Sequence, residues 1–343
     1  DVTGKLITPG LIDLHGHFAI DITPLRADPD PTNLGIGVTT VVDAGSTGWC
    51  NFPGFRHYVI DRVDTDIYAF LHLSAIGSTT FSVVGMADLE NLKFAREDEV
   101  IKCIETHDDV LLGVKVRLSP DGTTAKNAED ALKMARRIAD HTNKRVMVHV
   151  MDALLPLGEI FQYLKPGDVA THIFQGTEHN ILDDRGNVNS DAWAAYKKGI
   201  IFDTACFAKH YSLPICKTAI EEKMLPHTIS TDITARWPDE EPGYNLLDIM
   251  SMFHGLGMTI ESVIKSVTSN AASIINRDDI GTLKIGANGD AAVLNIEHGN
   301  FTFDDKVGNQ LETHQRFSPI LTIKDGKRWQ EGLNSISVSR TSS

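Results

Sequence analysis

Short apolar runs, rich in β-branched residues, recur along most of the chain and alternate with segments of helical spacing. They lie near residues 11–17, 38–44, 67–76, 110–118, 145–151, 168–174, 200–206 and 228–233. Continuous apolar runs bounded by turn residues are typical of strands buried on both faces, as in parallel sheets. The pattern therefore predicts eight strands in an α/β protein with a parallel sheet.

The segments between these runs predict helices and two long loops. Residues 127–139 carry apolar side chains at helical spacing, and residues 246–275 do so as two helices broken at Gly255-Leu256-Gly257. Residues 50–62 and 233–244 are predicted to be loops. In barrel proteins, loops at the carboxyl ends of the strands build the active site, so both segments bear on function.

Two histidines, His15 and His17, stand at the carboxyl end of the first apolar run, which follows the turn signal Pro9-Gly10. Alternate residues of a strand share one face, so both imidazoles point the same way. Two neighbouring neutral imidazoles are a ready pair of metal ligands. The pair alone is weak evidence, because histidines at this spacing also occur on surfaces and in cores.

Four further polar residues end apolar runs later in the chain: Lys115, His149, His172 and Asp232. A polar residue at the end of a β-branched run is unusual, and four in succession with ligand chemistry indicate a common centre. Functional residues at the carboxyl ends of the strands favour a closed (β/α)₈ barrel over an open sheet. An open nucleotide-binding sheet would carry a glycine-rich phosphate loop after its first strand, and residues 15–18 do not form one.

The order of these polar residues, His-x-His, Lys, His, His and Asp, resembles the amidohydrolase superfamily of metal-dependent hydrolases. Residues 9–17 are similar to that family's opening strand, and residues 281–294 are similar to its closing segment, where the chain leaves the barrel. Residues 37–46 resemble the amidohydrolase/deacetylase branch, which is also named dihydroorotase-like. The resemblance spans nearly the whole chain.

The resemblance implies a TIM barrel over residues 11–277 and a small β-domain built from residues 1–10 and 278–343. Members usually carry some tens of residues before the first barrel strand, whereas this sequence starts at Asp1. We therefore expect the N-terminal part of the β-domain to be missing, either because the sequence is truncated or because the protein was trimmed.

The resemblance also implies a centre of two divalent metal ions, expected to be zinc. In the family pattern the more buried ion is held by His15, His17 and Asp232, and the more exposed ion by His149 and His172. Lys115 would bridge the ions after carbamylation by carbon dioxide, because a lysine with a pKa near 10.4 is a cation and binds no metal. The alternative is a lysine that extends to solvent or pairs with an acid.

The predicted activity is hydrolysis of an amide or acetyl ester of a small carboxylate-bearing molecule. A hydroxide that bridges the ions would attack the carbonyl, and Asp232 would take its proton and pass it to the leaving group. One alternative is hydrolysis of a cyclic amide, as by dihydroorotases or hydantoinases. Another is a non-catalytic barrel scaffold, which the complete set of ligand residues disfavours.

Candidate substrate contacts lie just beyond the predicted ligands. Arg117 shares the face of Lys115 nearer the barrel mouth, where it would clamp a substrate carboxylate or pair with a neighbouring acid. Gln175 and Gly176 would contact the substrate's carbonyl or acyl group. Asp13 is expected either to orient a ligand imidazole or to be a structural carboxylate tied to backbone amides.

Other residues near the strand ends receive smaller roles. Phe18 stands where dihydroorotases place a carboxylate-binding arginine, which disfavours that activity and predicts a pocket for an apolar or aromatic group. Ser46 is a weaker candidate for substrate contact. His57, His179 and His210 lie in or near predicted loops and are expected to be exposed rather than to participate.

Composition narrows the class of protein. The chain has 343 residues, 42% of them hydrophobic, and a net charge of −14. That length holds one large core, and the acidity disfavours nucleic acids and anionic membranes as partners. Four scattered cysteines, no apolar run of transmembrane length and no recognisable signal peptide predict a cytoplasmic protein. We expect a small-molecule substrate and, from the resemblance, a homo-oligomer.

Overall fold

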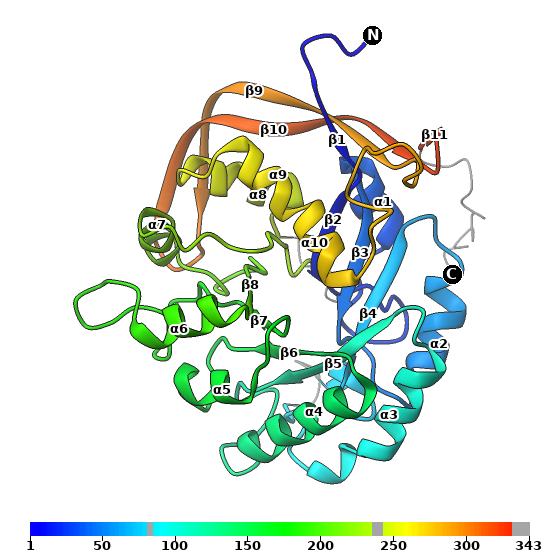
Figure 1. Ribbon diagram of the computed structural model, residues 1–343, viewed down its shortest axis with the longest axis vertical. Coiled ribbons are helices and arrows are strands. Elements are labelled where there is room, and N and C mark those ends of the chain that lie inside the picture. The colour runs from blue at the N-terminus through cyan, green and yellow to red at the C-terminus, as the bar shows by residue number, and fades with distance from the viewer. Residues whose placement is uncertain (81–84, 235–242, 331–343) are drawn as a thin grey trace, which may run out of the picture.

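The computed structural model describes residues 1–80, 85–234 and 243–330, and its centre is a parallel sheet curled into a barrel (Figure 1). The strands neighbour one another in chain order. They are β2 (Leu11–Gly16), β3 (Val38–Ala44), β4 (Asp66–His72), β5 (Leu111–Arg117), β6 (Arg145–His149), β7 (Val169–Thr171) and β8 (Ile201–Asp203). Seven of the predicted strands therefore form, and the expected α/β barrel is confirmed.

The prediction of an eighth strand over residues 228–233 needs correction, because this segment forms isolated bridges and no continuous ladder. Asp203 bridges Thr228 on one side, and Gly16 bridges Ile233 on the other, both in parallel. The amide of Asp232 donates to the carbonyl of His15 over 2.7 Å, which closes the ring. Asp232 has φ 57°, a left-handed conformation that a continuous strand does not accommodate.

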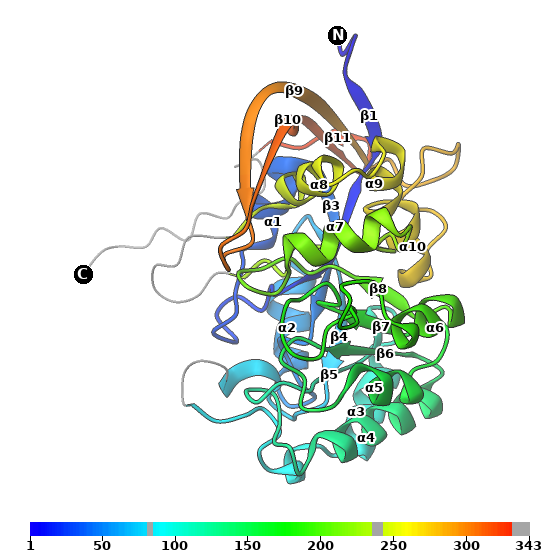
Figure 2. The same cartoon turned by 90° about the vertical axis from the view of Figure 1, so that its left-hand side faces the viewer.

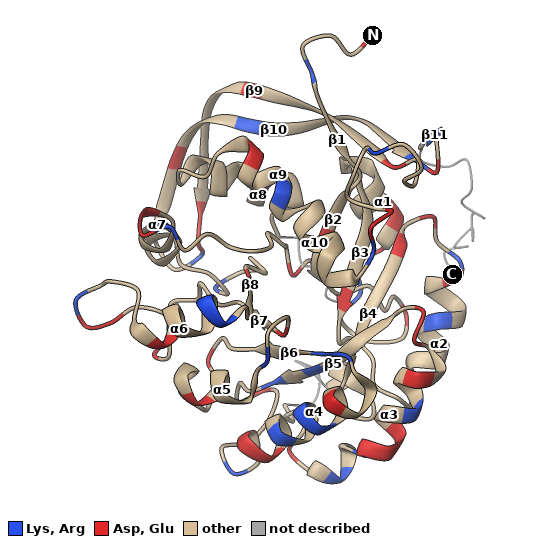
Figure 3. Ribbon diagram, viewed as in Figure 1, with Lys and Arg blue, Asp and Glu red and all other residues tan. Residues whose placement is uncertain are grey.

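Helices surround the barrel (Figures 1 and 2). They are α1 (Pro29–Asn33), α2 (Phe52–Phe55), α3 (Glu97–Thr106), α4 (Ala128–Thr142), α5 (Leu157–Tyr163), α6 (Ser190–Lys198), α7 (Leu213–Glu221), α8 (Leu246–Gly255), α9 (Ile260–Ser266) and α10 (Ser269–Ile275). The outer helices, α3 and α4 among them, carry interspersed acidic and basic residues, as expected of faces in water (Figure 3). No helix in the described part of the chain is long and apolar enough to cross a membrane.

Two predictions about helices need correction, while residues 127–139 do form α4. Residues 246–275 break at Gly255 as predicted but also a second time, into three helices. The second break follows from Val267, whose carbonyl accepts the amide of Ile12 in β2 over 2.8 Å. Residues 50–62 contain α2 and a π-helical turn, Arg56–Ile60, and are not simply a loop. Most of the other predicted loop, 233–244, lies outside the described residues.

A second, antiparallel sheet brings the two ends of the described chain together in the order β1-β9-β10-β11. Its strands are β1 (Leu6–Pro9), β9 (Ala291–Asp304), β10 (Gln310–Lys324) and β11 (Lys327–Arg328). The long β9–β10 ribbon arches over α8 (Figure 2), and the amide of Phe317 donates to Ser251 of α8 over 2.9 Å. Leu294 and Phe317 belong to the same apolar cluster as the barrel's outer layer, so the division into two domains stays a prediction.

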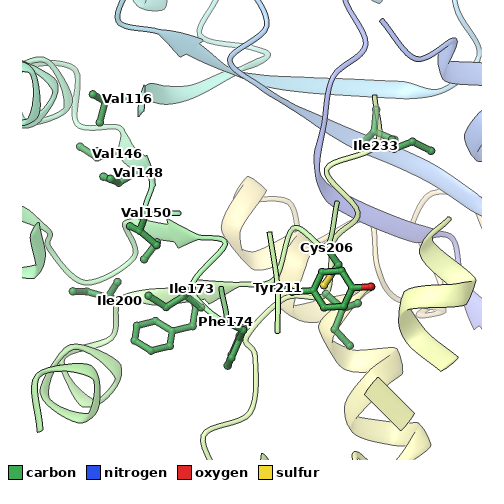
Figure 4. Packing of buried hydrophobic residues seen from close by; sticks show 14 of the residues in the cluster. Val116, Val146, Val148, Val150, Ile173, Phe174, Ile200, Cys206, Tyr211 and Ile233 are labelled. Atoms are coloured by element: carbon green, nitrogen blue, oxygen red, sulfur yellow. The ribbon is translucent and has the colours of Figure 1, made fainter. Parts of the chain in front are cut away.

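The apolar core has two layers, which explains why the site sits where it does. Outward-facing strand residues such as Val116, Val146 and Val148 pack toward the helices (Figure 4). A separate cluster fills the interior near the amino ends of the strands, where Ile274 of α10 closes the barrel. Inward-facing residues at the carboxyl ends are left to line a cavity.

Candidate metal centre

The six predicted ligands converge at the carboxyl end of the barrel. All are buried and line one cavity: His15, His17, Lys115, His149, His172 and Asp232. The tightest group is His15, His172 and Asp232, whose ligand atoms lie within 4.8 Å of one another. One carboxylate oxygen of Asp232 also lies 3.2 Å from the Nε2 atoms of both His15 and His17. Nitrogen and oxygen donors gathered in this way suit zinc or a similar divalent ion.

The rings of His15 and His172 are oriented by partners on their Nδ1 atoms. His15 Nδ1 lies 2.7 Å from the Thr171 hydroxyl, which donates to Asp203 over 2.7 Å and therefore accepts from the ring. His172 Nδ1 lies 3.0 Å from the carbonyl of Ala205, which can only accept. Both rings therefore carry their proton on Nδ1, and their Nε2 lone pairs are available to a metal ion.

His17 is held by an equivalent relay on a different strand. Its Nδ1 lies 2.8 Å from the Ser46 hydroxyl, and that hydroxyl donates to Asp43 over 2.7 Å. Ser46, a weak candidate for substrate contact from the sequence, thus orients a predicted ligand. A carboxylate behind each hydroxyl fixes the direction of the hydrogen bonds, which is the arrangement that supports metal-binding imidazoles.

Lys115 is the most unusual side chain of the cavity. It is 1% exposed, and its Nζ has no hydrogen-bond partner among the described residues. Burial lowers the pKa of Lys115 to about 7, against the weaker attraction of Asp232. A buried amine of low pKa is in part neutral, which is the form that reacts with carbon dioxide. The absence of a side chain at Gly45 leaves room for the side chain of Lys115, because a Cβ at Gly45 would lie 2.7 Å from Lys115 Cγ.

Burial also sets the protonation of the neighbouring ligands. It holds the pKa of His149 and of His172 well below the ordinary histidine value, and nearby cationic groups add to this effect. These imidazoles are therefore neutral near pH 7 and able to bind a metal ion. Burial alone would raise the pKa of Asp232, but His15, His17 and His210 hold it well below its usual range. Asp232 is thus an anion.

The backbone is strained where two of the ligands attach. His172 has φ 61° and Asp232 has φ 57°, and Ala205, which holds the His172 ring, has φ 45°. Each left-handed non-glycine residue costs on the order of 1–3 kcal/mol and persists only where its surroundings impose it. The conformation turns both side chains inward at the ends of their segments.

Asp13 proves to be a structural carboxylate. It accepts the amide of His15 over 3.2 Å, and the amide and hydroxyl of Thr231 over 3.1 and 2.5 Å. Burial raises the pKa of Asp13 to about 7. Of the two roles expected for Asp13, these contacts fit the one in which it ties backbone segments together, here β2 and the closing segment of the barrel.

Arg117 lines the cavity as expected, and it is paired with two acids. Its guanidinium donates to Asp88 over 3.0 Å and to Asp121 over 2.5 Å. Arg117 is 7% exposed, and the Asp88 side chain is fully buried, so the pair is fixed in place. A contact between Arg117 and substrate stays a prediction.

Gln175 and Phe18 lie outside the described residues that line the cavity. The Gln175 amide donates to the carbonyl of His179 over 2.8 Å and accepts the amide of Thr177, so it organises its own loop. Its contact with substrate stays a prediction. Phe18 is fully buried, with its ring against Gly16, whereas the apolar side chain of Leu25 does line the cavity. That the pocket accepts an apolar or aromatic group stays a prediction.

His210 is a cavity residue that was not expected from the sequence. Its Nδ1 lies 2.7 Å from the second carboxylate oxygen of Asp232, and its side chain lines the cavity. The expectation that His210 is merely an exposed loop residue is therefore wrong. Its place in the loop after a barrel strand was the available signal, because such loops carry active-site residues.

Comparisons with known proteins show which family the chain belongs to. The model of the amidohydrolase family matches residues 6–328. A deacetylase of Brucella anthropi is 31% identical over 323 residues, which cover 94% of this chain and 79% of that protein. A deacetylase of Enterococcus faecalis is 30% identical over 326 residues, covering 94% and 86%.

Comparison with solved structures shows that the chain shares its fold with several of them. A structure described as an adenine deaminase has a TM-score of 0.89 at 30% identity, covering 95% of this chain and 88% of the other. One described as a dihydroorotase has a TM-score of 0.86 at 29% identity, covering 95% and 86%. A D-hydantoinase, at 13% identity and a TM-score of 0.64, shares the fold.

Proposed function

The chain belongs to the amidohydrolase family, and we propose that it is a metal-dependent deacetylase acting on a small, carboxylate-bearing amide or acetyl ester. The observation that carries the proposal is the convergence of five ligand-type side chains, four imidazoles and a carboxylate, around an unpartnered, fully buried lysine amine. The deacetylases at 30–31% identity support removal of an acetyl group. Cytoplasmic location and assembly into a homo-oligomer remain predictions.

The residues fit a binuclear centre. His15, His17 and Asp232 would hold one ion, and His149 and His172 the other. Carbamylated Lys115 would bridge them, because conversion of the amine to an anion removes the cost of an unpaired amine in the cavity. Zinc is the proposed metal, because the proposed ligands are four imidazoles and a carboxylate besides Lys115. When bound, such ions supply a water of lowered pKa and a Lewis acid for the substrate carbonyl.

Asp232 is the proposed general base and acid. Its low pKa keeps it ionised at neutral pH, and it can accept a proton from the attacking water. It then returns the proton to the leaving nitrogen or oxygen, which gives acetate and an amine or alcohol. His210 holds the second oxygen of Asp232 over 2.7 Å and so fixes the rotamer from which both transfers occur.

Hydrolysis of a cyclic amide is the weaker alternative. The structural relative described as a dihydroorotase is 29% identical, so the two chains share family and fold. The position after His17, however, holds the buried Phe18, which offers no cation to a substrate carboxylate. A non-catalytic scaffold has no reason to keep a complete ligand set with oriented imidazoles.

The proposal is tested by metal analysis joined to a substrate screen. Protein loaded with zinc and bicarbonate should contain about two equivalents of metal and hydrolyse N-acetyl amino acids or O-acetyl hydroxy acids in preference to cyclic amides. Labelled bicarbonate should give a carbamate carbon resonance that is absent from Lys115→Met. Less than half an equivalent of metal, with no hydrolysis of any acetylated compound, would refute the function.

A further inference from the structure

The metal cavity opens into a second, larger hollow at the barrel mouth. The inner cavity has a volume of about 30 Å³ and the outer hollow about 480 Å³. The two share Arg117, His149, Phe207 and His210, so they are continuous at the predicted ligand His149. Among the described residues, most of the free space lies in the outer hollow, so a substrate whose acetyl carbonyl reaches the inner cavity would extend its leaving group into the outer hollow.

Among the described residues, Arg117 and Lys209 are the cations that line the outer hollow, and they differ in how firmly they are held. Arg117 forms ion pairs with Asp88 and Asp121, and moving it would leave the fully buried carboxylate of Asp88 without its cationic partner. Lys209 has a looser partner, since its Nζ lies 3.5 Å from Asp152 and its side chain is 62% exposed. An exposed pair at that distance is easily exchanged for another carboxylate.

The backbone around Lys209 is specified more tightly than its side chain. Ala208 has φ 47°, and Ala205, three residues earlier, has φ 45°, although neither is glycine. The amide of His210 donates back to the carbonyl of Phe207 over 2.8 Å, which closes the turn. Such strain in a short loop is retained where the loop must present particular side chains. This loop presents His210 to Asp232 and Lys209 to the outer hollow.

We propose that Lys209 is the residue that binds the carboxylate of the substrate's leaving group, by exchanging its loose partner Asp152 for that carboxylate. The inference rests on the proposed deacetylase function and assigns its specificity. Arg117 is then a positioning residue that fixes the wall behind the substrate. Apolar groups of Met151 and Phe207 line the same hollow and would contact the carbon skeleton between acetyl group and carboxylate.

The test compares Lys209→Met with a matched control on a matched substrate pair. Lys217→Met is the control, because Lys217 is equally exposed and has a loose carboxylate partner, Glu221, at 4.0 Å on α7. The substrates are an O-acetylated 2-hydroxy acid and its carboxamide. Lys209→Met should raise KM for the acid about fivefold with little change in kcat, and leave the carboxamide unaffected. The KM of wild type for the acid should also rise with salt, as for an exposed charge pair.

A binding measurement separates failure of this inference from failure of the proposed function. The free 2-hydroxy acid is titrated calorimetrically into zinc-loaded wild type, Lys209→Met and Lys217→Met, which requires no turnover. Binding that weakens only in Lys209→Met supports the inference even if no acetyl compound is hydrolysed. Equal effects of Lys209→Met on the acid and the carboxamide, no effect on either, or no binding of the acid to wild type would each overturn it.

Discussion

At the scale of single residues, the centre depends on which nitrogen of each imidazole carries the proton. The acceptors opposite Nδ1 are a carbonyl for His172 and hydroxyls already committed to carboxylates for His15 and His17. The carbonyl cannot donate at all, and the hydroxyls could donate to the rings only by breaking their hydrogen bonds to the carboxylates. The residues behind the ligands therefore determine metal-binding competence as much as the ligands themselves.

Asp232→Asn isolates the proton-transfer role from the ligand role. The amide keeps the shape and one oxygen of the carboxylate, but it cannot accept a proton at neutral pH. We expect kcat to fall by about 10²–10⁴ while the bound metal, measured by elemental analysis, stays near the wild-type level. Turnover close to wild type would show that another group moves the proton.

Lys115 should give the metal-free protein a pH-dependent stability. Its pKa is lowered from 10.5 to about 7 in the folded state, so between these values the unfolded chain binds more protons. Stability must then rise with pH across that window, by up to about 1.4 kcal/mol per unit. Urea unfolding of metal-free protein in bicarbonate-free buffer at pH 7 and pH 9 measures this. Lys115→Met should flatten the rise, and an equally steep rise in the variant would assign it elsewhere.

At the scale of elements, a buried lysine forms ion pairs between the β9–β10 ribbon and the barrel, in addition to the hydrogen bonds and apolar contacts that join them. Lys324 at the end of β10 is 7% exposed and lies 3.2 Å from Asp66 of β4, 3.4 Å from Asp290 and 3.0 Å from Asp325. Burial raises the pKa of Asp66 although Lys324 lowers it, so that carboxylate relies on its partner.

Lys324→Met should therefore destabilise the fold without touching the site. The change leaves the buried Asp290 carboxylate without its cation, which costs about 3 kcal/mol, whereas the pairs with Asp66 and Asp325 are exposed to solvent and add little. The denaturant midpoint should fall, while kcat and metal content of the folded fraction stay unchanged. Lys327→Met, an exposed change on β11, is the control and should be neutral. Equal midpoints for the two variants would contradict this role of Lys324.

The elements that could be predicted from sequence are those with a strong local signal. Continuous β-branched runs predicted the strands that contain Lys115 and His149 to within a few residues. The segment before Asp232 carried the same signal but forms bridges, because the left-handed Asp232 interrupts its ladder.

What failed depends on contacts between distant segments. The helical spacing of residues 246–275 could not reveal the break at Val267, which β2 imposes by a hydrogen bond. Likewise, the pairing of Arg117 with Asp88 and of His210 with Asp232 joins residues far apart in the chain. The ligand set was accessible because each ligand lies at or near the end of an apolar, β-branched run in the sequence.

At the scale of the molecule, the barrel has one weak seam, which the predicted ligands span. Parallel ladders join β2 through β8, whereas residues 228–233 meet β2 and β8 through isolated bridges and single hydrogen bonds. His15 and His17 stand on one side of this seam and Asp232 on the other, with their ligand atoms 3.2 Å apart. An ion bound by all three would therefore join β2 to the closing segment of the barrel.

Metal removal should consequently loosen the seam before the rest of the barrel. Without the ion, the Asp232 carboxylate and two imidazoles lose their common partner, and only short-range hydrogen bonds hold the closing segment. Chelation should lower Tm, and hydrogen exchange should accelerate first in residues 11–17 and 228–233, while β4 and β5 on the opposite side stay protected. Restoring zinc should reverse the change in wild type but not in a His15→Ala, His17→Ala double variant. A uniform acceleration of hydrogen exchange in all barrel strands would show that the metal centre stabilises the whole barrel and not specifically the contact between β2 and the closing segment.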